Sequence, residues 1–122
     1  MKKHTTTITK PIELSDQDID DLMVTALEGG INYWVRSIKD IVPDGVKYEY
    51  RSDLITKGGS LEITDDEMGD TNILNLENFL EGVQKACEHF GFNSGEELMD
   101  FHDAITADCI IQFALYKEIT FG

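Results

Sequence analysis

The sequence has few cysteines, few basic residues and no long hydrophobic run, and each shortage argues against a class of protein. Its two cysteines, Cys87 and Cys109, are far apart and have no partner motif, so we expect buried, reduced thiols rather than a disulfide framework. No apolar run approaches the roughly 18–20 residues needed to cross a bilayer. The opening MKKHTTTITKP has threonines where a secretion signal has an apolar core. We therefore expect a soluble, cytoplasmic chain without membrane contact.

Patterns that carry metal, cofactor or catalytic chemistry are also missing. Cys87 and His89 are two residues apart, so on a helix they point to different faces, and His102 and Cys109 share a face only if one helix spans both. The acidic stretch from Asp66 has methionine and threonine where a calcium loop needs an oxygen ligand and a glycine. The two double glycines lack the pattern of a phosphate-binding loop. We expect no metal, no cofactor and no catalytic residue, and we interpret the protein as a non-enzyme.

What the chain has in excess is negative charge. Asp and Glu number 24 against 10 Lys and Arg, for a net charge of −14. Residues 15–28 carry about −5, residues 59–78 about −6 and residues 79–122 about −6, whereas residues 29–58 are close to neutral. Such a surface repels nucleic acid and anionic membranes, and it attracts a basic groove on a protein. The alternative interpretation is a surface whose charge only keeps the chain in solution.

The stretch SDQDIDDLMVTALEGG predicts a helix with both ends marked. Ser15 is a good N-cap, Asp18 can complete a capping box, and the apolar residues between them and the glycines follow one buried helix face. We expect Gly29 to end this helix with a positive φ. The next stretch, INYWVRSIKDIV, is rich in β-branched and aromatic residues and predicts a strand to about residue 41. On that strand Tyr33 and Trp34 would point to opposite faces, with core packing as the default for both and partner contact as the alternative.

The second half of the chain predicts a hairpin followed by helices. Residues 46–57 fit either a strand or a helix, and we favour a short helix near 51–57, capped by Ser52. The alternation around the acidic turn DDEMGD predicts a hairpin with a solvated tip. Asn75 then caps a long apolar stripe that Gly91 ends, SGEEL offers a second capping box, and a final helix is expected from about Asp103 to Tyr116.

The predicted fold class is α+β, with a small antiparallel sheet covered by about three main helices. One domain is expected over residues 1–122, because nothing in the composition indicates a linker or an internal repeat. Residues 1–10 are predicted as a flexible or edge-strand N-terminus.

Two segments, DIDDLMVTALEGGINYW and ADCIIQFALYKEITFG, resemble a group of small acidic proteins encoded by phages, prophages and mobile elements of Gram-positive bacteria. The middle of the chain resembles the same group more loosely, through KGGSLEI and LENFLEG. The resemblance implies an intracellular accessory role during infection or in the maintenance of mobile DNA. It implies no activity, cofactor or site residue.

Our leading hypothesis from these observations is a non-enzymatic accessory protein that binds a basic host protein. An inhibitor of a nucleic-acid-handling or defence factor would fit, because its acidic face could occupy a basic groove. We expect no direct contact with nucleic acid. The candidate partner-binding residues are Asp16, Asp18, Asp20, Asp21, Asp65, Asp66, Glu67, Asp70 and Trp34.

A rival hypothesis is a protein that binds or sequesters a small, nucleotide-like molecule. A phosphate needs a local basic pocket in so acidic a chain, and only the near-neutral middle segment offers one. The candidate ligand-binding residues are Arg36, Lys39, Lys47, Arg51 and Lys57. A catalyst would need a pocket of converging titratable groups, which the sequence alone does not show.

Overall fold

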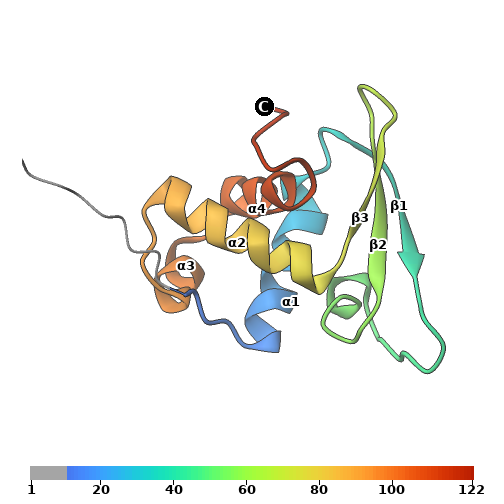
Figure 1. The fold of residues 1–122 in the computed structure, drawn as a ribbon, viewed down its shortest axis with the longest axis horizontal. Coiled ribbons are helices and arrows are strands. Elements are labelled where there is room, and N and C mark those ends of the chain that lie inside the picture. The colour runs from blue at the N-terminus through green and yellow to red at the C-terminus, as the bar shows by residue number, and fades with distance from the viewer. Residues whose placement is uncertain (1–10) are drawn as a thin grey trace, which may run out of the picture.

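The computed structural model of the protein describes residues 11–122, so the prediction for residues 1–10 lies outside the described part. The chain forms one α+β domain in which helices lie on one side and a three-stranded sheet on the other (Figure 1). In chain order the elements are α1 (Asp16–Thr25), a π-helical turn η1 (Ala26–Gly30), β1 (Val35–Ile41), a 3₁₀ turn η2 (Arg51–Asp53), β2 (Ser60–Asp65), β3 (Thr71–Leu74), α2 (Leu76–Phe90), α3 (Gly95–Phe101) and α4 (Ala104–Tyr116). The predicted fold class is confirmed.

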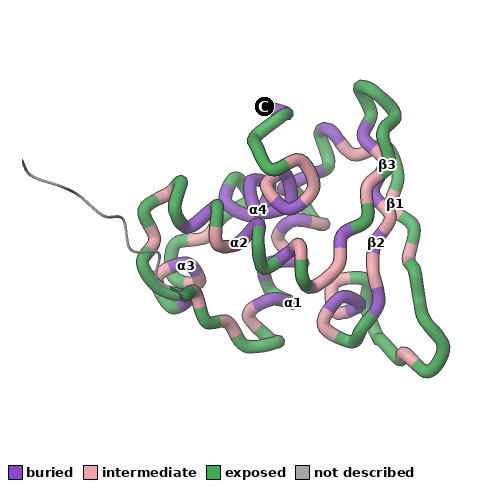
Figure 2. The backbone as a smooth tube through the Cα atoms, viewed as in Figure 1, coloured by how far each residue is buried: buried purple, intermediate pink, exposed green. Residues whose placement is uncertain are grey.

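The last helix, α4, is the centre of the molecule. Its residues 106–112 are all buried, as expected for a helix surrounded by other elements rather than lying on a surface. Helix α2 lies close against it, because Gly82 has no side chain there and a Cβ at that position would clash with the carbonyl oxygen of Ile110. Figure 2 shows α4 buried over most of its length, whereas the tip of the β2–β3 hairpin is exposed.

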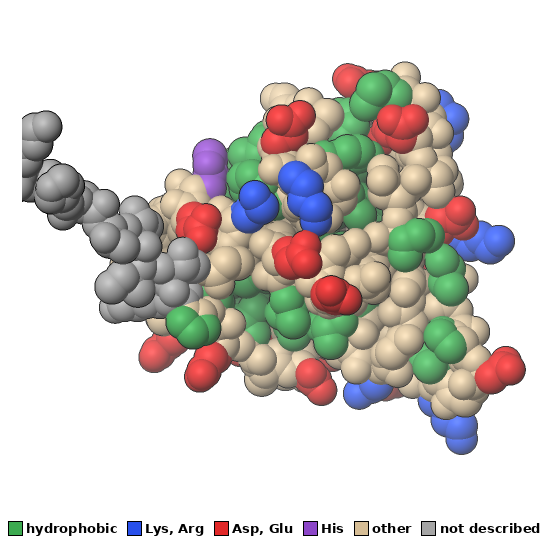
Figure 3. Space-filling view, viewed as in Figure 1, with side chains coloured by type: hydrophobic (Ala, Val, Ile, Leu, Met, Phe, Trp, Pro, Cys, Tyr) green, Lys and Arg blue, Asp and Glu red, His purple; other side chains and the backbone are tan. Residues whose placement is uncertain are grey.

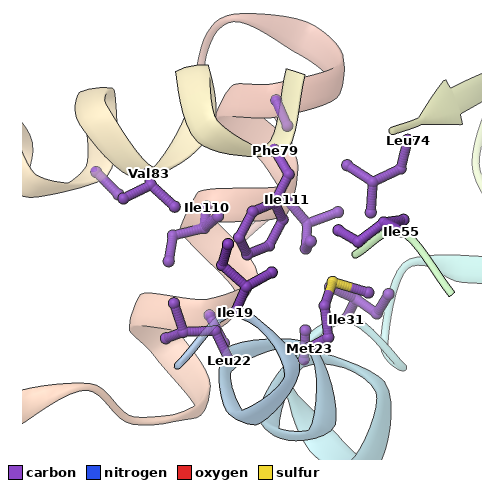
Figure 4. Close-up of a cluster of buried hydrophobic side chains, with 14 of the residues drawn as sticks. Ile19, Leu22, Met23, Ile31, Ile55, Leu74, Phe79, Val83, Ile110 and Ile111 are labelled. Atoms are coloured by element: carbon purple, nitrogen blue, oxygen red, sulfur yellow. The ribbon is translucent and has the colours of Figure 1, made fainter. Parts of the chain in front are cut away.

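The hydrophobic core joins α1, the turn after η2, the sheet and α2 around α4. Figure 4 shows side chains from these elements pointing toward one another. The labelled members are Ile19, Leu22 and Met23 from α1, Ile31 and Ile55 from the connecting turns, Leu74 from β3, Phe79 and Val83 from α2, and Ile110 and Ile111 from α4.

The predicted helix starts are confirmed by their caps. The side chain of Ser15 accepts from the backbone N–H of Asp18, whose carboxylate accepts in return from the N–H of Ser15. Asn75 caps α2, and Gly91 ends it in the left-handed conformation with φ 78°. The final helix begins at Ala104 with Asp103 as its cap, within a residue of the prediction.

The double glycine does not end the first helix in the way predicted. Gly29 has no positive φ, because the chain continues from α1 into the π-helical turn η1. The backbone N–H of Ile31 donates to the carbonyl of Ala26, which closes this wider turn. Gly30 is the constrained glycine: a Cβ there would lie 3.0 Å from the carbonyl oxygen of Ala104, at the start of α4. The second glycine therefore permits close packing between η1 and α4.

The strand prediction begins four residues too early. Residues 31–34 form a turn in which the N–H groups of Trp34 and Val35 both donate to the carbonyl of Ile31. Strand β1 begins only at Val35 and ends at Ile41, as predicted. Tyr33 and Trp34 therefore do not alternate across a sheet.

The hairpin prediction is confirmed, whereas the helix predicted near 51–57 is present only as the three-residue 3₁₀ turn η2 at Arg51–Asp53, with turns over residues 54–58. Strand β2 pairs antiparallel with β1 and β3, and Arg36 forms a bulge where the β1 register shifts. The N-cap of η2 is Tyr50, whose N–H donates to the carboxylate of Asp53, and not Ser52, which lies within the turn. None of the helices in the described part is long and apolar enough to span a membrane.

Candidate functional site

A cluster of buried and part-buried hydrogen bonds forms where residues 33 and 34 meet α4. The indole Nε1 of Trp34 donates to Oδ1 of Asp108 at 2.7 Å, and the hydroxyl of Tyr33 donates to Oδ2 of the same carboxylate at 2.5 Å. The turn at residues 31–34 makes this possible, because it directs two neighbouring side chains toward one helix. The prediction that Tyr33 and Trp34 point to opposite faces is therefore wrong.

Gln112 extends the cluster to residues 118–122, which we call the final segment. Its Nε2 donates to Asp108 Oδ1 at 2.9 Å and to the carbonyl of Phe121 at 3.2 Å. Its Oε1 accepts from the backbone N–H groups of Thr120 and Phe121, both at 2.8 Å. One amide side chain thus satisfies three backbone groups of the final segment while it is fixed by the carboxylate one helical turn away.

Aromatic rings close the cluster on its other side. The ring of Phe121 stacks on Trp34 with 4.8 Å between centroids and 8° between planes. Tyr116 contacts both rings edge-on. The Tyr33 ring is exposed although its hydroxyl is bonded, and burial of that hydroxyl, followed by the bond to Asp108, raises the pKa of Tyr33 to about 12.

A groove of about 460 Å³ lies beside this cluster. Its walls come from η1, the start of α4 and the final segment, and its exposed apolar side chains are Tyr33, Ile105 and Ile119. Asp108 is the one charged side chain that lines it, and both oxygens of that carboxylate already accept hydrogen bonds. The groove therefore suits apolar groups and offers no cationic side chain for a phosphate.

The structure changes the set of candidate partner-binding residues. Trp34 and Asp65 are buried, so neither is available at the surface as predicted. Asp65 accepts from the N–H groups of Met68, Gly69 and Asp70, and these bonds, that of Met68 foremost, lower the pKa of its carboxyl. The turn needs this carboxylate to satisfy its backbone, which is why the residue lies inward.

Some of the remaining acidic candidates form hydrogen bonds within the fold, and the others are exposed. Asp18 serves in the helix cap and Asp20 accepts from the hydroxyl of Thr56. Asp16, Asp21, Asp66, Glu67 and Asp70 are exposed. The start of α1 and the hairpin tip lie at different ends of the molecule (Figure 1), so the two acidic groups do not form one surface. Figure 3 shows carboxylates dispersed over the viewed face, between apolar and basic side chains.

The candidate ligand-binding cations do not converge either. Arg36 pairs with Asp66 at 3.4 Å, and Arg51 pairs with Asp40 at 2.7 Å. The three candidate lysines, Lys39, Lys47 and Lys57, are exposed. Arg51 lines a surface concavity together with Tyr50 and Glu28, so the carboxylate of Glu28 opposes its charge there.

Within residues 11–122, no group of three or more His, Cys, Asp or Glu side chains is placed to hold a metal ion. Cys87 and Cys109 are both buried free thiols, as expected from the sequence. Burial raises the pKa of Cys87 to about 11, which disfavours the reactive thiolate.

The residues that sequence reasoning missed are Asp108, Gln112 and Phe121. Asp108 and Gln112 are four apart in a stretch that is otherwise mostly apolar, a spacing that places two polar side chains together on a buried helix. Buried polar side chains need hydrogen-bond partners, so this pair was the feature of the sequence that could have predicted a buried polar cluster. No sequence pattern indicated that Phe121 would return to Trp34.

Comparisons of the chain with protein-family models, with curated proteins and with solved structures found no significant match to any of them.

Proposed function

We propose that the protein acts without catalysis, by binding a basic surface on another protein. The observation that carries this proposal is the uncompensated charge of the described surface. All 24 acidic residues lie within residues 11–122, together with seven of the ten basic ones. Only three ion pairs form in this range, and they use Arg36, Arg51 and Lys117. Most carboxylates are therefore free to meet a cationic partner.

The hairpin tip is the part of this surface best suited to binding. It presents the exposed side chains of Asp66, Glu67, Met68 and Asp70. The buried carboxylate of Asp65 holds the turn through three backbone N–H groups, and Tyr116 of α4 donates to that carboxylate at 3.4 Å. A turn held in this way presents its charges without much ordering cost on binding.

The context that we propose is an accessory protein of a phage or mobile element, in the cytoplasm of its host. Host factors that handle nucleic acid have basic grooves, and an acidic protein that fills such a groove would inhibit the factor. This proposal rests on the charge distribution and on the resemblance of the two end segments.

The test compares two variants of equal net charge. In Glu67→Gln/Asp70→Asn the tip loses two charges, and in Glu88→Gln/Glu96→Gln two exposed charges are lost from α2 and α3. A partner is first captured from host extract at low salt, identified and purified, and its affinity for each variant is measured by calorimetry. We expect a loss of about tenfold for the tip variant, a smaller loss for the control, and affinity that falls with ionic strength. Equal losses for the two variants would contradict a role for the tip, and affinity that does not depend on salt would contradict charge-driven binding.

A further inference from the structure

The final segment is held by contacts of the kind that hold a bound peptide. It forms no helix or strand, and its backbone is held by one side-chain amide: Gln112 accepts from two successive N–H groups and donates to the carbonyl of Phe121. The hydroxyl of Tyr33 donates to the same carbonyl at 3.3 Å. These contacts recognise backbone groups of a turned, non-helical segment, in which two successive N–H groups point to one oxygen, and they do not depend on which side chains flank the anchor residue.

One side chain anchors the segment. Phe121 is 5% exposed and stacks on Trp34, whereas residues 118–120 and Gly122 are exposed. Tyr116 forms a third aromatic wall, with its ring centroid 5.5 Å from that of Phe121. The cavity that Phe121 occupies is thus an aromatic pocket with a backbone-binding amide at its edge.

The pocket is built independently of the segment that fills it. Asp108 accepts from Trp34 at 2.7 Å and from Gln112 at 2.9 Å, and neither bond involves residues 118–122. The indole and the amide therefore stay in position when the segment leaves. Preorganisation of this kind favours binding of a replacement.

The end of α4 separates the segment from the helix. Lys117 caps α4 in the left-handed conformation with φ 64°, and its N–H donates to the carbonyl of Phe113. Helical hydrogen bonds therefore stop at this residue, and the segment beyond it is held by the contacts of the pocket.

We propose that the pocket formed by Trp34, Tyr116 and Gln112 is a recognition site for a non-helical peptide segment of another protein that carries an aromatic side chain, and that the final segment occupies this site in the isolated chain. The exposed groove beside it, lined by Tyr33 and Ile105, accommodates the residues that flank the aromatic anchor. None of the ion pairs among the described residues joins the pocket to its occupant, so binding here does not depend on charge as binding at the hairpin tip does. The two sites share one residue, because Tyr116 also donates to Asp65 beneath the tip.

Phe121→Ala in the full chain tests the proposal, with Trp34 as the only tryptophan and hence the reporter. Loss of the stacked ring should shift the tryptophan emission to longer wavelength. A capped synthetic peptide with the sequence of residues 118–122 should reverse this shift in a saturable manner at millimolar concentration, because a tethered segment competes at an effective concentration of that order. The wild-type chain should show no response to the peptide, since its own Phe121 fills the pocket.

Two controls make the result decisive. The same peptide with alanine in place of phenylalanine should have no effect, and Leu74→Ala, a core change on β3 outside the pocket, should not be rescued by either peptide. Phe121→Leu provides a milder opening of the pocket if the alanine variant does not fold. Absence of a saturable response in both Phe121 variants, or an equal response to the alanine peptide, would overturn the proposal. An unchanged response at high salt would separate this site from charge-driven binding.

Discussion

Replacement of Asp108 tests the buried cluster most directly, because two substitutions separate its role as an acceptor from its charge. Asp108→Leu removes the acceptor of three hydrogen bonds. Two of the donors keep alternatives, since the Tyr33 hydroxyl and Gln112 Nε2 both also reach the carbonyl of Phe121. The indole of Trp34 has no other acceptor among residues 11–122, so it becomes a buried, unsatisfied donor.

The expected magnitude follows from this count. A stranded buried donor costs about 1–3 kcal/mol, and the two weakened bonds add roughly 0.5–1.5 kcal/mol each at most. We therefore expect Asp108→Leu to lower the free energy of unfolding by about 3 kcal/mol, or the melting temperature by roughly 10 °C for a chain of this length. In Asp108→Asn the side-chain oxygen still accepts from Trp34 and Gln112, and the amide can donate to the Tyr33 hydroxyl, so the loss should stay within about 1 kcal/mol.

Urea denaturation followed by tryptophan emission and by circular dichroism measures both variants. Equal, large losses for leucine and asparagine would show that the negative charge, and not the accepting oxygen, holds the cluster together. A neutral Asp108→Leu would show that the indole bond is absent in solution.

Three further predictions concern other parts of the same architecture. Gly30→Ala should lower the free energy of unfolding by about 1–2 kcal/mol in chemical denaturation, because its Cβ would crowd the backbone of α4. Gly29→Ala places its Cβ in open space on a helical turn, so it should be neutral or raise the free energy of unfolding by up to about 1 kcal/mol. Asp65→Asn should lower the melting temperature at pH 7, whereas Asp66→Asn should not. The native pKa of the Asp65 carboxyl is depressed, so its contribution to stability is lost when the carboxylate is protonated. The difference between the two variants should therefore shrink as the pH falls below the unfolded pKa near 3.8. Tyr33→Phe should reduce the alkaline loss of stability between about pH 10 and 12, because the raised native pKa of Tyr33 means that the unfolded chain releases its proton first; an unchanged alkaline profile would contradict the bonded hydroxyl.

The elements that the sequence predicts correctly are those with local signals. The capping boxes at Ser15 and Asn75, the glycine stop at Gly91 and the apolar stripe of α2 each determine structure within a few residues, so they were readable. The wider turn η1 could not be predicted, because a π-helical turn has no characteristic composition. Glycine is needed at position 30 because α4, which lies far along the chain, packs closely against it.

The errors at the site have two different physical origins. Asp65 continues the alternation of Leu61 and Ile63 on the buried face of β2, so the period of the strand predicted its burial, and the acidic composition of the turn obscured that signal. Trp34 and Asp108, by contrast, meet across a separation of 74 residues, and no local pattern encodes such a contact. Long-range polar pairs of this kind become visible only when the helices are placed.

The buried cluster disfavours an empty pocket at Trp34, Tyr116 and Gln112. It does not disfavour replacement of the final segment by a peptide from another chain. Gln112 Oε1 is satisfied by the N–H groups of Thr120 and Phe121, so departure of the final segment leaves a buried amide oxygen without a donor and uncovers the indole face of Trp34. A backbone from another chain with an aromatic side chain restores both interactions at once, whereas water restores only the first. Asp108 keeps the amide and the indole in place during the exchange through bonds that do not involve the segment. The buried carboxylate therefore contributes specificity as well as stability, because it fixes the two groups that select the next occupant.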